Sequence, residues 1–239
     1  MTLLCMEAIM DYNEKNYTEQ RVSLSVYTSR TFGWMFFGLM VTFILAYTSY
    51  STGFIIQILS IPYLYYILPL AEIALVIWLS SRIHKISIVA AQSLFFVYAL
   101  LNGLTFAVYF LIYDVASMIY VFSATAALFG VMAVYGYFTK RDLSKWRSVL
   151  FFGLITLIGF WIFSMFINLS QFETIICLLG IVIFVGFTAY DTQKIKAFYE
   201  FYYNDTQMLE KASIISALQL YLDFINLFIY LLRFLGRRK

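Results

Sequence analysis

Long apolar stretches separated by short polar connections fill the 239-residue chain beyond its first thirty residues. Each stretch approaches the ~20 helical residues that are needed to cross a bilayer core of ~30 Å. The seven stretches are residues 32–50, 62–81, 87–112, 116–138, 148–169, 172–191 and 212–235. Because they lack the alternation of barrel strands, the pattern predicts an all-α polytopic membrane protein with seven transmembrane helices.

Composition supports this class of protein, with 63% hydrophobic and only 12% charged residues. A soluble domain typically has about 45–50% apolar and about 25% charged residues. Residues 1–30 carry both acids and bases, and the first apolar stretch starts too late for a typical cleaved signal peptide. We therefore expect an N-terminal segment (1–30), a single transmembrane domain (31–236) and a basic tail (237–239).

Basic residues occur in alternate connections and predict the orientation of the chain. No Lys or Arg occurs in the connections 51–61, 113–115 and 170–171. By the positive-inside rule, the N-terminus is expected in the cytoplasm. A second basic cluster consists of Arg233, Arg237, Arg238 and Lys239. The charge rule favours a re-entrant last segment that keeps this cluster inside, whereas the length of the segment favours a full seventh crossing.

Few residues are suited to enzyme chemistry or to a resident metal. The chain has one histidine, His84, and two cysteines, Cys5 and Cys177, too few for a typical zinc site or disulfide framework. It has no phosphate-binding glycine loop, no H-E-x-x-H and no G-x-S-x-G motif. The Lys and Arg residues lie at membrane edges. We expect no enzyme, no cofactor and no nucleic-acid partner.

Asp223 is the clearest candidate for function, because it lies inside the last apolar stretch. Polar residues recur there at spacings of 3, 4, 3 and 4, which place them on one helical face: Ser216, Gln219, Asp223, Asn226 and Tyr230. A charged residue at mid-bilayer costs several kcal/mol and normally faces a protein or water interior. The alternative is a packing seam, although amides and hydroxyls would suffice for one. Both interpretations predict that this helix is enclosed by the others.

Three further charged residues lie in or at the end of the apolar stretches, and two of them have more ordinary explanations. Asp191 lies one turn before Lys194, a position that also fits a helix end at the membrane surface. Glu72 lies in the middle of the second stretch, with no partner on its own helix. Arg82, at the end of that stretch, is either a positive-inside anchor or a counter-ion for a carboxylate on a neighbouring helix.

Two carboxylates close together in a low-dielectric site cannot both ionise freely, so they tend to share a proton. Their oxygens also suit Ca²⁺. Lys194 places Asp191 about one turn, roughly 5 Å, inside the cytoplasmic edge. Asp223 can meet it there only if the last helix begins in the cytoplasm and enters the bilayer near Leu218. That placement would put Arg233 at the outer surface and favours the full seventh crossing.

Three segments carry recognisable motifs: TAALFGVMAVYGYFTKRDLSKWRSVLFFGL (125–154), TAYDTQKI (188–195) and ALQLYLDFINLFIYLLR (217–233). Together they resemble the Bax inhibitor family, the transmembrane Bax inhibitor motif proteins, in its bacterial branch. The resemblance implies six helices wrapped around a central C-terminal seventh. It also implies a pH-sensitive calcium leak channel with an aspartate pair, Asp191 and Asp223. The link 196–213 is long for this branch, which would either extend the flanking helices into the cytoplasm or alter how the pair closes.

The resemblance assigns Arg82 as a latch on the pair and places Glu72 along the ion path, where we add Gln219 and Asn226 as candidates. We therefore expect a Ca²⁺ leak channel gated by protonation of the pair, with Ca²⁺ as the permeant and transiently bound ion. The lack of a targeting extension and the style of the motifs favour a bacterial inner membrane. The alternatives are a regulator of a membrane-bound protease, acting through the N-terminal segment, and a proton-coupled transporter. The oligomeric state is left open, and a monomer is compatible with the sequence.

Overall fold

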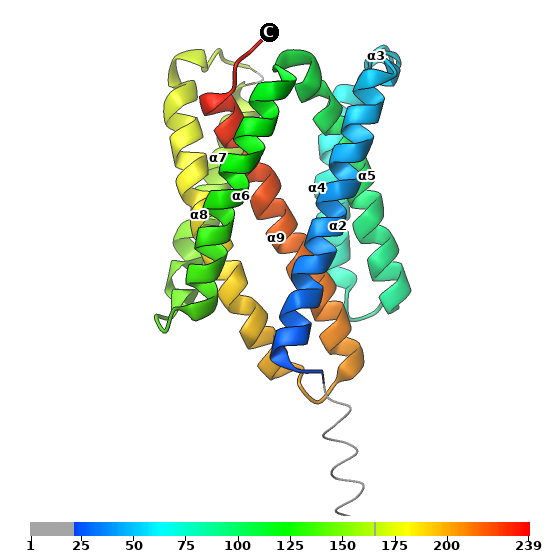
Figure 1. Cartoon of the computed structure of the whole chain (residues 1–239). Helices are drawn as coiled ribbons and strands as arrows, with labels where there is room; N and C mark the ends of the chain where they lie inside the picture. The colour runs from blue at the N-terminus through cyan, green and yellow to red at the C-terminus, as the bar shows by residue number, and fades with distance from the viewer. Residues whose placement is uncertain (1–21, 165) are drawn as a thin grey trace, which may run out of the picture.

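Long α-helices make up most of the computed structural model, which describes residues 22–164 and 166–239. The elements are α2 (Leu24–Ser51), α3 (Phe54–Leu59), α4 (Leu64–Arg82), α5 (Ile88–Ile112), α6 (Val115–Phe138), η1 (Leu143–Trp146), α7 (Arg147–Ser164), η2 (Ser170–Phe172), α8 (Glu173–Phe201) and α9 (Thr206–Leu235). The long helices stand side by side as a bundle (Figure 1). Each predicted apolar stretch coincides with one long helix, which confirms the all-α fold class.

Side-chain caps show why several helices begin where they do. The caps of α2, α5, α6 and α9 are Ser23, Ser87, Asp114 and Asp205. Each side chain accepts a hydrogen bond from the backbone N–H three residues later, at 2.9–3.3 Å. Such caps satisfy N–H groups that have no partner inside the helix. Because α2 starts at Leu24, its first two turns precede the apolar stretch predicted from residue 32.

Six segments within the described residues are long and apolar enough to cross a membrane: Leu24–Ser51, Ile88–Ile112, Val115–Phe138, Leu143–Ser164, Ser170–Phe201 and Thr206–Leu235. The seventh long helix, α4, has 19 residues, with Pro69 and Glu72 inside it, and does not meet this criterion. It packs mainly along α5. Together these helices make the chain an all-α polytopic membrane protein.

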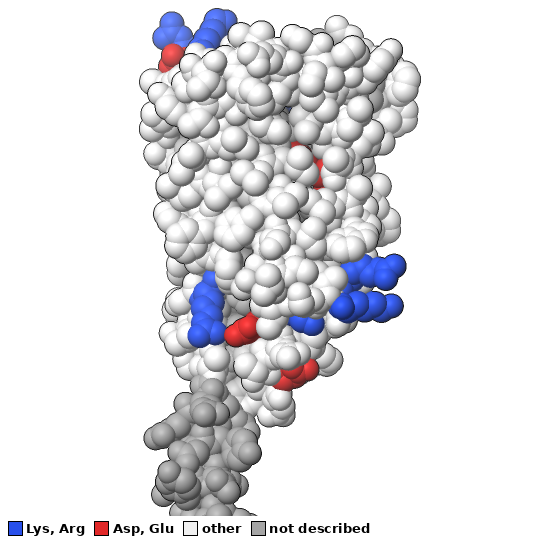
Figure 2. Space-filling view, turned by 90° about the vertical axis from the view of Figure 1, so that its right-hand side faces the viewer, with Lys and Arg blue, Asp and Glu red and all other residues white. Residues whose placement is uncertain are grey.

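The two ends of the bundle differ in what they carry. We call the end of the bundle where α2 begins and residues 202–205 join α8 to α9 the turn end. The opposite end, where the α5–α6 connection meets the C-terminus, is the tail end (Figure 1). On the face in Figure 2, Lys and Arg gather at two levels, and the broad band between them is white apart from one small acidic area. Large exposed hydrophobic side chains, such as Phe37, Val131 and Val182, fit a lipid-facing surface.

The last helix, α9, is the central one. In its most apolar window 67% of the residues are buried, against 11–44% in the other five spans. It packs directly against α2, α5, α6 and α8, whereas α4 packs mainly on α5 and α7 on α8. Thr42 of α2 forms hydrogen bonds with both α9 and α5. Its hydroxyl lies 2.5 Å from the hydroxyl of Tyr221 on α9 and donates to the Ala99 carbonyl of α5 at 2.9 Å. The enclosure predicted from the polar stripe is confirmed.

Only residues 202–205 separate α8 from α9, so most of the link 196–213 is helical, which agrees with the first of its two interpretations, an extension of the flanking helices. At the other end of α9, the C-terminal residues pair with the α5–α6 connection. The Asp114 N–H donates to the Arg237 carbonyl at 3.1 Å, and the Lys239 N–H donates to the Ile112 carbonyl at 2.9 Å. The last segment is therefore a full crossing of the bundle and not a re-entrant one.

Candidate functional site

Asp191 of α8 and Asp223 of α9 lie in the interior of the bundle, with only 8% and 4% of their surface exposed. The two helices pack along each other, and Asp223 is close enough to Asp191 for the two charges to interact. A carboxylate in such surroundings is stable only if it is protonated, hydrogen-bonded or paired with a cation. The surroundings of this pair therefore determine what it can do.

A close contact with α6 fixes the position of α8 beside the pair. Gly136 of α6 lies against the backbone of Ala189, two residues before Asp191, and a Cβ added there would come within 2.8 Å of the Ala189 Cα. Only glycine allows the two helices to touch so closely. This contact holds the Asp191 segment at a fixed depth in the bundle.

Lys194 is the cation beside the pair in the part of the chain that the structure describes. Its Nζ lies 4.0 Å from Oδ1 of Asp191, one helical turn away, and donates to Oε1 of Gln219 on α9 at 3.4 Å. Its charge also acts on Asp223. The amide of Gln219 thus helps to hold the ammonium between α8 and α9.

Among the described residues, the acids of the site outnumber its cations. Asp191 and Asp223 are both under the influence of one ammonium, that of Lys194. Among the described residues, buried Oδ2 of Asp223 has no hydrogen-bond partner. An unsatisfied buried carboxylate oxygen is costly, and binding of a proton or a cation would relieve it. The geometry therefore suits reversible uptake of positive charge between α8 and α9.

Comparison with known proteins agrees with this architecture. The model of the family described as "Inhibitor of apoptosis-promoting Bax1" matches residues 24–239. This chain belongs to the Bax inhibitor family. It is 40% identical over 228 residues to the inner membrane protein YbhL of Escherichia coli, covering 92% of this chain and 95% of the relative. It is 39% identical over 214 residues to an uncharacterized protein of Borreliella burgdorferi, covering 89% and 92%.

The resemblance to the Bax inhibitor family predicted that Arg82 contacts the Asp191–Asp223 pair as a latch. This contact is not formed in the structure. Arg82 is exposed at the last residue of α4, and within residues 22–164 and 166–239 it makes no ion pair. Its neighbour His84 lies at the turn end, with its ring centroid 6.5 Å from that of Tyr202. The cation beside the aspartates is Lys194 instead.

The three residues predicted for an ion path lie in different places. Glu72 accepts hydrogen bonds from Thr105 at 2.6 Å and Asn102 at 3.2 Å, both on α5, so it forms a separate acidic site. Gln219 belongs to the aspartate site through Lys194. The amide of Asn226 donates to the Leu222 carbonyl of its own helix at 2.8 Å.

The polar stripe of α9 serves two purposes. Toward the turn end, Gln219 and Asp223 take part in the charged site. Toward the tail end, Tyr230 stacks on Phe184 of α8 with centroids 5.9 Å apart, beside Gly180, which is an aromatic contact and not a hydrogen bond between helices. The stripe is thus part charged site and part aromatic packing.

No cluster of three or more His, Cys, Asp or Glu side chains occurs in the part of the chain that the structure describes. Asp191 and Asp223 alone supply too few oxygens for the six to eight ligands of a resident Ca²⁺, so water and carbonyl groups would have to complete the shell. The donor set fits a passing cation better than a permanent one.

Lys194 is the site residue whose role the sequence analysis missed, since we used it only to mark the membrane edge. The signal was its i, i+3 spacing from Asp191, a spacing at which side chains on a helix meet. Its second partner, Gln219, lies on another helix and required the tertiary structure.

Proposed function

We propose that this protein is a proton-controlled Ca²⁺ leak pathway of the bacterial inner membrane. In this proposal Asp191 and Asp223 form the sensor, and Lys194 is its counter-charge. The observation that carries the proposal is the site between α8 and the central helix α9, where two buried carboxylates depend on one ammonium. The name of the Escherichia coli relative supports the choice of membrane.

The charge balance of the site provides a gate. With both aspartates ionised, Lys194 pairs with Asp191 on its own helix and holds α9 through its attraction to Asp223 and its hydrogen bond to Gln219. A proton on the pair removes negative charge and weakens this attraction, because Coulomb energy scales with the product of the charges. The pathway is then closed at higher pH and opens as the pH falls.

Glu72 offers a second position for a cation along the pathway. It is half-buried between α4 and α5, and its carboxylate is oriented by Thr105 and Asn102. Carboxylate and amide oxygens are ligands that Ca²⁺ accepts. Ca²⁺ crosses the membrane as cargo in this scheme and is not held as a cofactor.

The test is Ca²⁺ flux in proteoliposomes over a range of pH, with Asp223→Asn beside the wild type. Asparagine keeps the shape of the side chain but removes its charge and its proton, so we expect flux that no longer responds to pH. The matched control is Asp205→Asn, an exposed helix cap at which asparagine is equally suitable. Unchanged flux and pH response in Asp223→Asn would refute the gate.

The same assay separates the two other functions considered from the sequence. A proton-coupled transporter would show saturable uptake of a substrate and no passive Ca²⁺ leak. A protease regulator would act through the N-terminal segment 1–30, of which 1–21 lie outside the described part of the chain. It would lose partner binding on deletion of 1–25 and keep any ion flux.

A further inference from the structure

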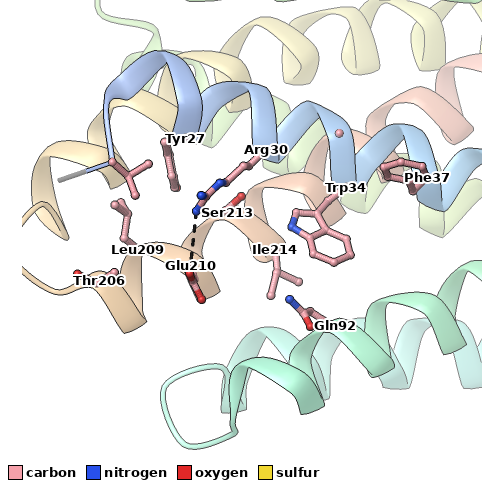
Figure 3. A pocket seen from close by; sticks show the side chains of 12 residues that line it. Tyr27, Arg30, Trp34, Phe37, Gln92, Thr206, Leu209, Glu210, Ser213 and Ile214 are labelled. Atoms are coloured by element: carbon pink, nitrogen blue, oxygen red, sulfur yellow. Dashed lines mark ion pairs between the residues drawn. The ribbon is translucent and has the colours of Figure 1, made fainter. Parts of the chain in front are cut away.

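A pocket of about 500 Å³ opens on the side of the bundle at the turn end, between α2, α5 and α9. Figure 3 shows the guanidinium of Arg30 reaching from α2 toward Glu210 of α9, with Trp34 and Gln92 nearby. The pocket shares no lining residue with the Asp191–Asp223 site. What it binds is therefore a question separate from the proposed gate.

The mouth of the pocket presents one charge of each sign. Arg30 Nη1 lies 4.0 Å from Glu210 Oε1, and their side chains are 51% and 44% exposed. Such a long, exposed ion pair contributes little to stability, so both groups can exchange this contact for a ligand without much loss. A ligand that carries both an anion and a cation would match the two groups at once.

The deeper part of the pocket is mostly apolar, with the amide of Gln92 beside Trp34 and Ile214, and it faces the lipid. Trp34 and Phe37 lie about one and two turns beyond Arg30 along α2, which is roughly 6 and 10 Å toward the middle of the bundle. Phe37 is 59% exposed, so this side is open to the bilayer. Buried Ile214 of α9 forms part of the opposite wall. Polarity therefore falls from the mouth inward, as it does along a phospholipid.

We propose that this pocket binds one phospholipid with a zwitterionic, primary-amine headgroup of the phosphatidylethanolamine class. Arg30 binds the phosphate, Glu210 binds the ammonium, and an acyl chain lies against Trp34 and Phe37. An anionic lipid without an amine would leave Glu210 beside its negative charge. A choline headgroup cannot donate hydrogen bonds to the carboxylate, whereas an ammonium donates up to three.

Gly33 allows the pocket to be filled without disturbing the fold. It lines the pocket, and a Cβ added to it meets no atom within 4 Å. Gly33→Leu therefore places a side chain where we place the lipid, at a helical position where glycine is a poor helix former. Gly130 of α6 is also helical with open space for a Cβ, so Gly130→Leu is the matched control.

The experiment is native mass spectrometry of the full chain after exchange with equal amounts of phosphatidylethanolamine, phosphatidylcholine and phosphatidylglycerol. We expect one retained lipid in the wild type and in Gly130→Leu, with the ethanolamine lipid preferred. Gly33→Leu should weaken retention roughly tenfold, the effect of excluding about two methylene groups of the acyl chain. Equal retention by Gly33→Leu and Gly130→Leu would overturn the site.

Two charge variants test the headgroup. Glu210→Gln removes the partner of the ammonium and should move the preference toward phosphatidylglycerol, while Arg30→Gln should weaken binding of all three lipids. The assignment of an ethanolamine headgroup is wrong if the wild type shows no preference among the three lipids, or if Glu210→Gln leaves the preference unchanged. Ca²⁺ flux through these variants is a separate readout, so a failure here leaves the gate standing.

Discussion

Two clusters of charge join α8 to α9, and they are built in opposite ways. Toward the turn end, two acids share one cation: Asp191 and Asp223 lie beside Lys194, and both acids are buried. At the tail end, two cations share one acid. Glu173 accepts from Arg233 at 3.4 Å and from Arg238 at 2.8 Å, and all three side chains are 29% exposed or more.

The two clusters differ in burial and in charge balance, and this difference distinguishes a site that responds to protons from an ion pair that only stabilises the fold. A buried site with excess negative charge responds strongly to a proton or a cation, because little solvent screens it. A partly exposed acid with two arginines already has its counter-charges, and solvent screens their attraction. We therefore expect the turn-end cluster to control function and the tail-end cluster to add modestly to stability.

The largest effect should come from breaking the packing beside the aspartate pair. In Gly136→Ala the new Cβ meets the backbone of Ala189, which cannot move aside as a side chain can. We expect a loss of about 1–3 kcal/mol in the free energy of unfolding, the usual range for an overpacked core. Thermal or denaturant unfolding in detergent measures it.

Two other glycines provide the comparison. In Gly180→Ala, toward the tail end, the Cβ meets the ring of Tyr230 at 2.5 Å, which can shift, so the loss should be smaller. In Gly130→Ala, where the Cβ has open space, stability should stay the same or rise by about 0.5–1 kcal/mol. Any other order of the three variants would contradict the backbone contact.

The next effect concerns the counter-charge. Lys194→Gln removes the only ammonium placed beside the pair within the described residues, which favours protonation and also weakens the hold between α8 and α9. Both changes act in the same direction, so the midpoint of the pH response of Ca²⁺ flux should move to higher pH by roughly one unit.

A neighbouring lysine serves as the control. Lys196, two residues on, donates to the Tyr137 carbonyl of α6 and lies over the ring of Tyr137. Lys196→Gln should therefore leave the midpoint in place, and Lys194→Arg should largely restore it. Equal shifts in the two glutamine variants would mean that Lys194 has no special role.

The smallest effect is expected at the tail end. Glu173→Gln removes the acid shared by Arg233 and Arg238, whose exposure limits the loss of stability to at most about 1 kcal/mol. The pH response of flux should not change. A loss of pH response in this variant would show that the tail-end cluster also takes part in gating.

The sequence was sufficient to predict most of the fold. Seven apolar stretches located the seven long helices that the structure describes, since hydrophobic length reports directly on membrane crossing. The stripe through Asp223 correctly indicated an enclosed last helix, because a polar face inside a bilayer must be covered by protein. Helix ends were less well predicted: α8 continues ten residues beyond Asp191, since charged residues end an apolar pattern without ending a helix.

The candidate site was predicted in part. Asp191 and Asp223 do lie in the interior of the bundle, on helices that pack together. Arg82 was expected at the pair, but its position at a helix end leaves it exposed. Lys194 takes that place because α9 brings Gln219 beside it. Contacts between side chains on different helices depend on helix rotation and depth, and hydropathy reports neither with enough accuracy.

By itself, the sequence determined the class of this protein, the positions of the long helices in the described part of the chain and the identity of its buried acids. These properties can be read from composition and periodicity, because the cost of placing polar groups in lipid determines the local pattern of the sequence. Only the tertiary structure decided which cation faces the aspartates, and it alone revealed the pocket between Arg30 and Glu210. Both depend on how helices distant in the sequence pack at a few close contacts, such as Gly136 on Ala189.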